Sequence, residues 1–517
     1  MRLPSWTWRV IRSRRTKIAL ACAPFVVCAL VAASYPVTGW LGRWQVKRHL
    51  AGLEAAGYAV DPEKYYVPSK SPDDDVLQHP AMIRERDDPK LARVYDREPK
   101  IPGLARRQPR VNAALAEEND LRLWLDPPPA DERAAAEQLL AELADAIRRM
   151  DEIRPALERR EAAWPLEYST HFLTGETGIP NVVSGQFLLK RLVQFQAELA
   201  LIQLADEDSS SAAIGVTSML EICRVFLDSR PNLVSLLLAD VTLRATEQLL
   251  REGVRRGMWT ADQLVDFDKH LGTLDPQASA SRCFRGEVAF ARWEAERLLA
   301  APDEIGAKGE LEWKEGWKWD RQRIVGRSRA LWRQLRPAGL DLMQSVEADR
   351  IFVRHAAESH GVPRTGFTPE EMLDFRERLS ECPEAYFSGG GWSSQNRDIV
   401  ASGWRELEYL AAGTLLMETR ISLIRGGLAL ERYRLLEGRH PTTLSDLVPP
   451  CMSAVPLDPF DGTPLRYRLQ ADGSPQLWSI GPDLVDEGGL PHRDRSKGDT
   501  VWITRPIPGF SKSDLNR

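Results

Sequence analysis

The feature that most constrains this chain is an uncharged run of 23 residues near its start, Ile18–Trp40. As a helix rising about 1.5 Å per residue, such a run can cross the roughly 30 Å hydrocarbon core of a bilayer. A single segment inside hydrocarbon must satisfy its own backbone hydrogen bonds, which only a helix does. The sequence therefore predicts one transmembrane anchor over residues 18–40.

The residues before this run predict how the anchor is oriented. Residues 1–17 contain six cations and no acid. Those cations are Arg2, Arg9, Arg12, Arg14, Arg15 and Lys17. Because basic flanks stay in the cytoplasm, we expect a cytoplasmic tail over 1–17 and a single-pass protein of the inner (cytoplasmic) membrane whose bulk is extracytoplasmic.

A cleaved signal peptide is the alternative interpretation of the same segment. Val31, Ala32 and Ala33 offer small residues near a plausible cleavage point. The uncharged run nevertheless continues through Pro36 to Trp40, beyond the usual apolar length of a signal peptide. This length favours a retained anchor, which would make the bilayer the first partner of the chain through residues 18–40.

The composition excludes several classes of protein. With 43% hydrophobic and 28% charged residues, the 517-residue chain is neither disordered nor a polytopic membrane protein. Its 69 Lys and Arg nearly balance 74 Asp and Glu, so no nucleic acid partner is expected. The chain beyond residue 17 contains 63 cations and all 74 acids, so the exported part has about eleven net negative charges.

Between the anchor and residue 403, apolar residues recur mainly at helical spacing, which predicts a multi-helix extracytoplasmic body over 41–403. Residues 61–110 are acidic, contain prolines and are expected to be irregular. Ser229 and Pro231 are interpreted as a helix start, and Thr260 with Gln263 as a capping box. The expected helices are 133–160 (one helix or a pair), 186–204, 212–227, 231–254, 260–271 and 278–300. No repeat of fixed period is visible, so the body is expected to be a bundle or solenoid-like.

The C-terminal part, residues 404–517, has a different pattern. A mostly apolar helix is expected over Trp404–Glu437 and is ended by Gly438 and Pro441. The runs 465–469 and 477–480 flank a turn and predict a β-hairpin. The overall prediction is a mainly α protein with a small α+β C-terminal domain.

Signatures of catalysis are missing from the sequence. It contains no Gly-x-Ser-x-Gly elbow, P-loop, dinucleotide fingerprint or HExxH zinc motif. Four cysteines lie outside the anchor, at positions 223, 283, 382 and 451, without CxxC spacing. They are expected to be buried thiols, and the sequence does not decide whether any two form a disulfide.

The order of motifs over the last hundred residues resembles the C-terminal half of the major pseudopilin of the type II (general) secretion pathway. The matching pieces are the helix end 430–441, the turn 455–462, Tyr467 and the segment 478–483. This resemblance implies a pseudopilin-like domain over 404–517. Here, however, some 360 residues separate the membrane run from that domain, so packing into a pilus in the usual way is not expected. The remainder resembles helical parts of uncharacterised membrane-anchored bacterial proteins, a likeness that implies no activity.

The resemblance also implies a calcium site, because the pseudopilin loop after the last hairpin holds this ion. By position, Asp483 and Asp499 match carboxylate ligands and Ile480 matches a backbone carbonyl ligand. Carboxylates and carbonyls at a bend are the oxygens that Ca²⁺ prefers. Leu484 stands where the family usually has Gly. The alternative is a metal-free acidic loop neutralised by the basic residues within 490–497.

Two classes of function fit these patterns. The first is a non-catalytic envelope protein whose helical body and pseudopilin-like tail bind an unknown protein partner. The second is an extracytoplasmic hydrolase or carbohydrate-active enzyme that uses carboxylates of the helical body. Because no recognisable nucleophile or metal set supports the second, the sequence favours a protein that is not an enzyme.

Overall fold

The computed structural model describes residues 72–88, 121–162, 182–283, 394–492 and 497–507, apart from residues 126, 160, 230–232 and 506, together with parts of 37–55. Nearly all of these residues belong to one compact unit, which includes the described residues between 63 and 287 and those from 404 onward. This unit is mainly helical and carries one small antiparallel sheet. The predicted class is confirmed to that extent, whereas the anchor and the extracytoplasmic position of the body stay predictions.

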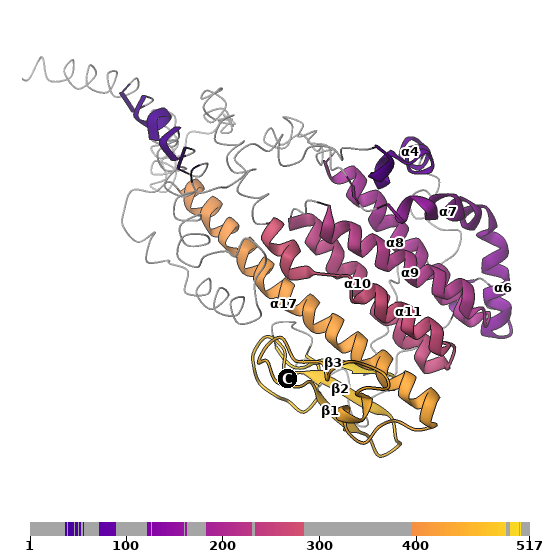
Figure 1. Cartoon of the computed structure of the whole chain (residues 1–517). Helices are drawn as coiled ribbons and strands as arrows, with labels where there is room; N and C mark the ends of the chain where they lie inside the picture. Colours follow the sequence, from indigo (N-terminus) through magenta and orange to yellow (C-terminus); the bar gives the residue numbers. More distant parts are fainter. Residues whose placement is uncertain are drawn as a thin grey trace, which may run out of the picture. The chain divides into compact units, whose positions relative to one another are not determined.

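Three consecutive helices form the centre of the described body (Figure 1). They are α8 (Val182–Ala205), α9 (Ser209–Asp228) and α10 (Leu233–Arg256). Each packs against the other two. α8 is apolar on most sides, as a helix enclosed by neighbours must be. α9 begins at Asp208, whose carboxylate accepts a hydrogen bond from the Ser211 N–H at 3.0 Å.

Shorter helices flank these three. The predicted segment 133–160 is a helical pair, α6 (Glu132–Glu142) and α7 (Ala144–Leu157). α11 (Ala261–Leu271) starts with the predicted capping box, in which Thr260 and Gln263 bond each other's backbone N–H. Residues 276–283 are helical, and the rest of the helix expected over 278–300 lies outside the described residues.

Two local expectations are corrected by the structure. Residues 61–110 are not wholly irregular, because α4 (Pro80–Asp87) lies within them and buried Glu85 pairs with Arg149 of α7 at 2.7 Å. Ser229 does not start α10 but ends α9, and its buried hydroxyl accepts the Ala162 N–H at 2.7 Å. In both places a contact with a segment distant in sequence decides the local structure.

The C-terminal part consists of α17 (Ser394–Glu437) and a three-stranded antiparallel sheet in the order β1–β2–β3 (Figure 1). β1 (Arg466–Leu469) and β2 (Pro475–Ser479) form the predicted hairpin. β3 (Thr500–Ile503) was not predicted and pairs with β2. α17 begins ten residues before the expected start and ends, as expected, at Gly438, whose φ is 71°.

The sheet lies directly on α17 at two adjacent glycines. A methyl group on Gly427 would overlap the indole ring of Trp502, and one on Gly426 would come within 2.7 Å of Leu477. Trp502 is only 1% exposed. The missing side chains therefore let β2 and β3 approach the helix closely enough to bury their apolar residues.

Ion pairs join α17 to the helical body. Arg420 of α17 pairs with Glu247 of α10, and both groups are largely buried. Arg425, one turn further on and partly exposed, pairs with Asp268 of α11 at 2.7 Å. The long helix is thus attached to two helices of the body as well as to the sheet.

The sequence also predicts a membrane span and buried cysteine thiols. Among the described residues, α9 alone is long and apolar enough to cross a membrane, and most of it is buried inside the protein. The predicted span 18–40 lies almost entirely outside the described residues. Cys223, Cys283 and Cys451 are buried free thiols, as expected, and Cys382 lies outside the described residues.

Candidate functional site

The candidate site is the loop between β2 and β3, residues 480–499, which we call the tail loop; the structure describes it apart from residues 493–496. Its two ends meet at Gly481 and Gly498, where a methyl group on Gly481 would collide with the Gly498 carbonyl oxygen. Gly481 has a φ of 71°, in the left-handed region that favours glycine. Leu484 has a φ of 60°, in the left-handed region that residues other than glycine seldom adopt.

Among the described acids of the tail loop, Asp499 is the most deeply buried, with 4% of its surface exposed. Its Oδ2 accepts the N–H groups of Gly489 at 2.7 Å and Leu490 at 3.1 Å. Its Oδ1 is buried without a hydrogen-bond partner among the described atoms. Burial, together with the charges of Glu487 and Asp486, raises the pKa of Asp499 to about 7 against the opposing effect of the two N–H donors.

Glu487 supplies a second unsatisfied acid beside Asp499. Its Oε2 is also buried without a described partner, and its carboxyl group is close enough to Asp499 to share a hydrogen bond when one of them is protonated. Burial and the charge of Asp483 raise the pKa of Glu487 as well. We call Glu487 and Asp499 the acid pair. A cation between them would satisfy both bare oxygens.

The other two predicted ligands have structural contacts of their own. Asp483 accepts the Val485 N–H at 3.3 Å and the Gly498 N–H at 2.8 Å, so its carboxylate braces the tail loop. The Ile480 N–H donates to Asp458 at 3.0 Å, whereas the atom predicted as a ligand is the Ile480 carbonyl oxygen. Across the described residues, no three His, Cys, Asp or Glu side chains converge as a metal site. A bound cation would therefore need backbone carbonyls in addition to the acid pair.

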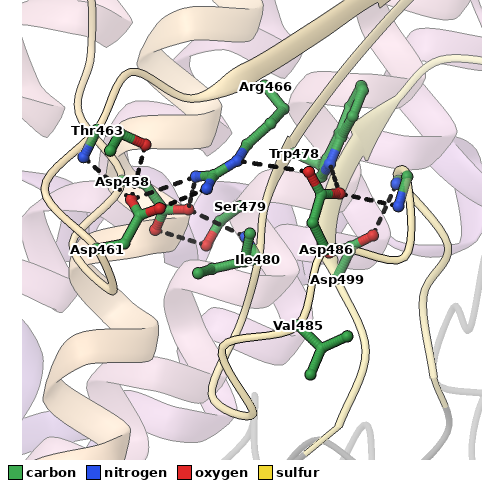
Figure 2. A network of polar contacts seen from close by, with 12 residues as sticks. Asp458, Asp461, Thr463, Arg466, Trp478, Ser479, Ile480, Val485, Asp486 and Asp499 are labelled. Atoms are coloured by element: carbon green, nitrogen blue, oxygen red, sulfur yellow. Dashed lines mark hydrogen bonds and ion pairs between the residues drawn. The ribbon is translucent and has the colours of Figure 1, made fainter.

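A second acidic centre lies around Asp458, across the Arg466 side chain from Asp486 (Figure 2). Asp458 is fully buried and accepts hydrogen bonds from Phe460, Ser479 and Ile480. It also pairs with Arg466 at 2.7 Å. Because these donors occupy both carboxylate oxygens, Asp458 has a structural role in joining the 455–462 turn to β2.

Arg466 continues this network towards the tail loop (Figure 2). Besides Asp458, it pairs with Asp461 and lies 3.8 Å from Asp486. Asp486 accepts the indole N–H of Trp478 at 2.9 Å, and this bond helps lower the pKa of Asp486. Asp486 is therefore held on the sheet side of the tail loop. Among the described acids of the tail loop, only Glu487 and Asp499 have buried side-chain oxygens without a hydrogen-bond partner.

The sequence predicts Asp499 and Asp483 as ligands and assigns no such role to Glu487, Asp458 or Arg466. The Asp-Pro-Phe-Asp-Gly run at 458–462 signals a turn, which could have identified Asp458 as a turn-forming acid. No comparable signal marks Glu487. Whether its oxygens are satisfied depends on where the folded backbone places its N–H groups.

Two carboxyl groups of the described helices have raised pKa values. Burial raises the pKa of Glu418 of α17 to about 7, and the charge of Asp275 acts in the same direction. Burial also raises the pKa of Asp228 of α9. The Cys223 thiol of α9 is buried, and burial raises its pKa, so it is not a reactive nucleophile. Glu418 and Asp228 are therefore the described groups of these helices on which the hydrolase alternative would have to rest.

Comparisons with known proteins add nothing to this assignment. No family model, curated protein or solved structure matches the chain.

Proposed function

We propose that this chain is a single-pass envelope protein, anchored by residues 18–40, which binds a protein partner outside the cytoplasm and carries a calcium-holding, pseudopilin-like tail. The proposal treats the protein as non-catalytic. The observation that carries its calcium-binding part is the acid pair, two carboxyl groups of the tail loop with buried oxygens that lack a partner among the described atoms. The long helix followed by a small antiparallel sheet supports the same interpretation.

Calcium suits the tail loop for a physical reason. A buried carboxylate oxygen without a partner has lost its hydration and gained nothing in return. Two such groups side by side also repel one another when both are ionised. Ca²⁺ takes six to eight oxygens at flexible geometry, from carboxylates, carbonyls and water. Binding of this ion would therefore remove both costs at Glu487 and Asp499.

Calcium should stabilise the full-length protein in detergent, and Asp499→Asn should abolish that effect. An ion that binds only the folded state adds about 2.7 kcal/mol when its concentration is a hundredfold above Kd. Thermal unfolding in chelator and in millimolar calcium measures the shift. Asp472→Asn is the matched control, because Asp472 lies at the β1–β2 turn outside the tail loop and should leave the shift intact.

The opposite result has a specific meaning for the tail loop. Equal unfolding temperatures of the wild-type protein in chelator and in calcium would show that basic residues within 490–497 balance the acids, as in the alternative interpretation. Loss of the shift in Asp472→Asn as well would mean that the stabilisation arises outside the acid pair.

The expected topology can be tested with a reporter enzyme that is active only outside the cytoplasm. Fused after Arg517, it should be active, because the six cations of residues 1–17 hold the N-terminus inside. Deleting residues 18–40 should abolish the activity. A cytoplasm-only reporter that works at the same position would contradict the proposed orientation.

A further inference from the structure

β3 connects the tail loop to the helical body. It begins at Thr500, the residue directly after Asp499. Two residues later, Trp502 is buried on α17, with the Arg251 guanidinium of α10 over its ring at 5.7 Å from the centroid. Arg251 also donates to the Val501 carbonyl oxygen at 3.5 Å. One side chain of the body thus contacts both the backbone and the aromatic ring of β3.

Arg251 is itself held by a buried acid. Its guanidinium pairs with Glu247 at 3.1 Å, and Glu247 is only 2% exposed at its side chain. Glu247 also pairs with Arg420 of α17. A charge network therefore runs from α17 through α10 to β3, where it ends within three residues of Asp499.

We propose that cation binding in the tail loop and docking of β3 onto α10 are thermodynamically coupled through Arg251. The proposal rests on the calcium binding proposed above and concerns how that binding is regulated. Without the cation, the two carboxylates of the acid pair repel one another whenever both are ionised, and this repulsion acts on Asp499 and through it on the start of β3. With the cation, Asp499 is fixed and β3 keeps the position in which Arg251 reaches both Val501 and Trp502.

Coupling of this kind is reciprocal. If calcium stabilises the contact between β3 and α10, the intact contact must raise the affinity for calcium by the same factor. The helical body would then sense the state of the tail loop, and a partner bound to the body would influence calcium binding. Besides calcium binding itself, this relation requires the contacts of Arg251 and the adjacency of Asp499 to β3.

The test measures calcium affinity of the full-length protein in detergent by titration calorimetry. Arg251→Ala should weaken calcium binding by about fivefold or more, the low end of typical coupling between sites. Arg251→Lys retains a charge for Glu247 but lacks the planar guanidinium, and should weaken binding less. Arg255→Ala is the control, because Arg255 lies one turn along α10 and pairs with Glu252.

Hydrogen exchange of α10 provides a readout that a general loss of stability would not reproduce. Calcium should slow exchange around Arg251 in the wild-type protein and not in Arg251→Ala. Absence of calcium binding in the wild-type protein would reject the proposed calcium site and the coupling with it. Wild-type binding with unchanged affinity in both Arg251 variants would leave the calcium site in place and overturn the coupling alone.

Discussion

Replacing Arg420 by alanine should destabilise the protein by about 3 kcal/mol. The substitution leaves Glu247, 2% exposed at its side chain, without its partner on α17. A buried carboxylate stripped of one partner keeps its desolvation cost, and breaking such pairs typically costs roughly 3–5 kcal/mol. We expect the lower end, because Arg251 still pairs with Glu247. Urea unfolding followed by circular dichroism measures the change.

Arg425→Ala is the matched control on the same helix. Its side chain is 42% exposed and pairs with Asp268, so the expected loss is below about 1 kcal/mol. The double variant Arg420→Met with Glu247→Leu should recover part of the loss, because it removes the buried carboxylate together with its partner on α17 but leaves Arg251 without Glu247. Equal effects of Arg420→Ala and Arg425→Ala would show that α17 is not held to the body through Glu247.

Local signals in the sequence are sufficient to predict the central helices of the body. The capping box of Thr260 and Gln263 involves neighbours only, and the structure confirms it. Apolar periodicity likewise identified α8, α9 and α10, since a buried helix needs apolar residues over most of its surface. Interactions within one turn of a helix can be predicted without knowing the rest of the molecule.

Features that depend on distant partners were not predictable in this way. β3 has four residues, and its partner β2 precedes it by 20 residues or more. The short helix α4 is held by the pair of Glu85 with Arg149, 64 positions away. The pair of Arg420 with Glu247 spans 173 positions. A short element whose stability comes from such contacts carries little signal in its own residues.

The same contrast between local signals and distant contacts applies to the candidate site. Asp499 and Asp483 could be proposed because a resemblance aligned them with known ligands. Glu487 can be recognised as a candidate ligand only from the hydrogen bonds of the folded chain, because its Oε2 and the Asp499 Oδ1 have no partners among the described atoms. Ile480, predicted as a carbonyl ligand, gives its N–H to Asp458. The chemistry of the tail loop is therefore set by tertiary hydrogen bonding more than by residue type.

Gly427→Ala should destabilise the protein by about 1–3 kcal/mol, the usual cost of overpacking a buried contact. In an ordinary helix the same substitution gains about 0.5–1 kcal/mol, because alanine loses less backbone entropy than glycine. Here the added methyl group would overlap the indole ring of Trp502, which is buried and lies between α17 and Arg251. The sign of the change in unfolding free energy therefore shows whether the sheet lies as close to α17 as the structure places it.

Gly272→Ala is the control with the opposite expected sign. Gly272 follows α11 with a φ of −68°, and the nearest atom to an added methyl group lies at 3.4 Å. It should be neutral or slightly stabilising. Trp502→Leu combined with Gly427→Ala should cost less than the sum of the single changes, because the smaller side chain makes room for the methyl group. Additive losses would show that Gly427 and Trp502 do not touch, and that β3 is held to the protein by other contacts.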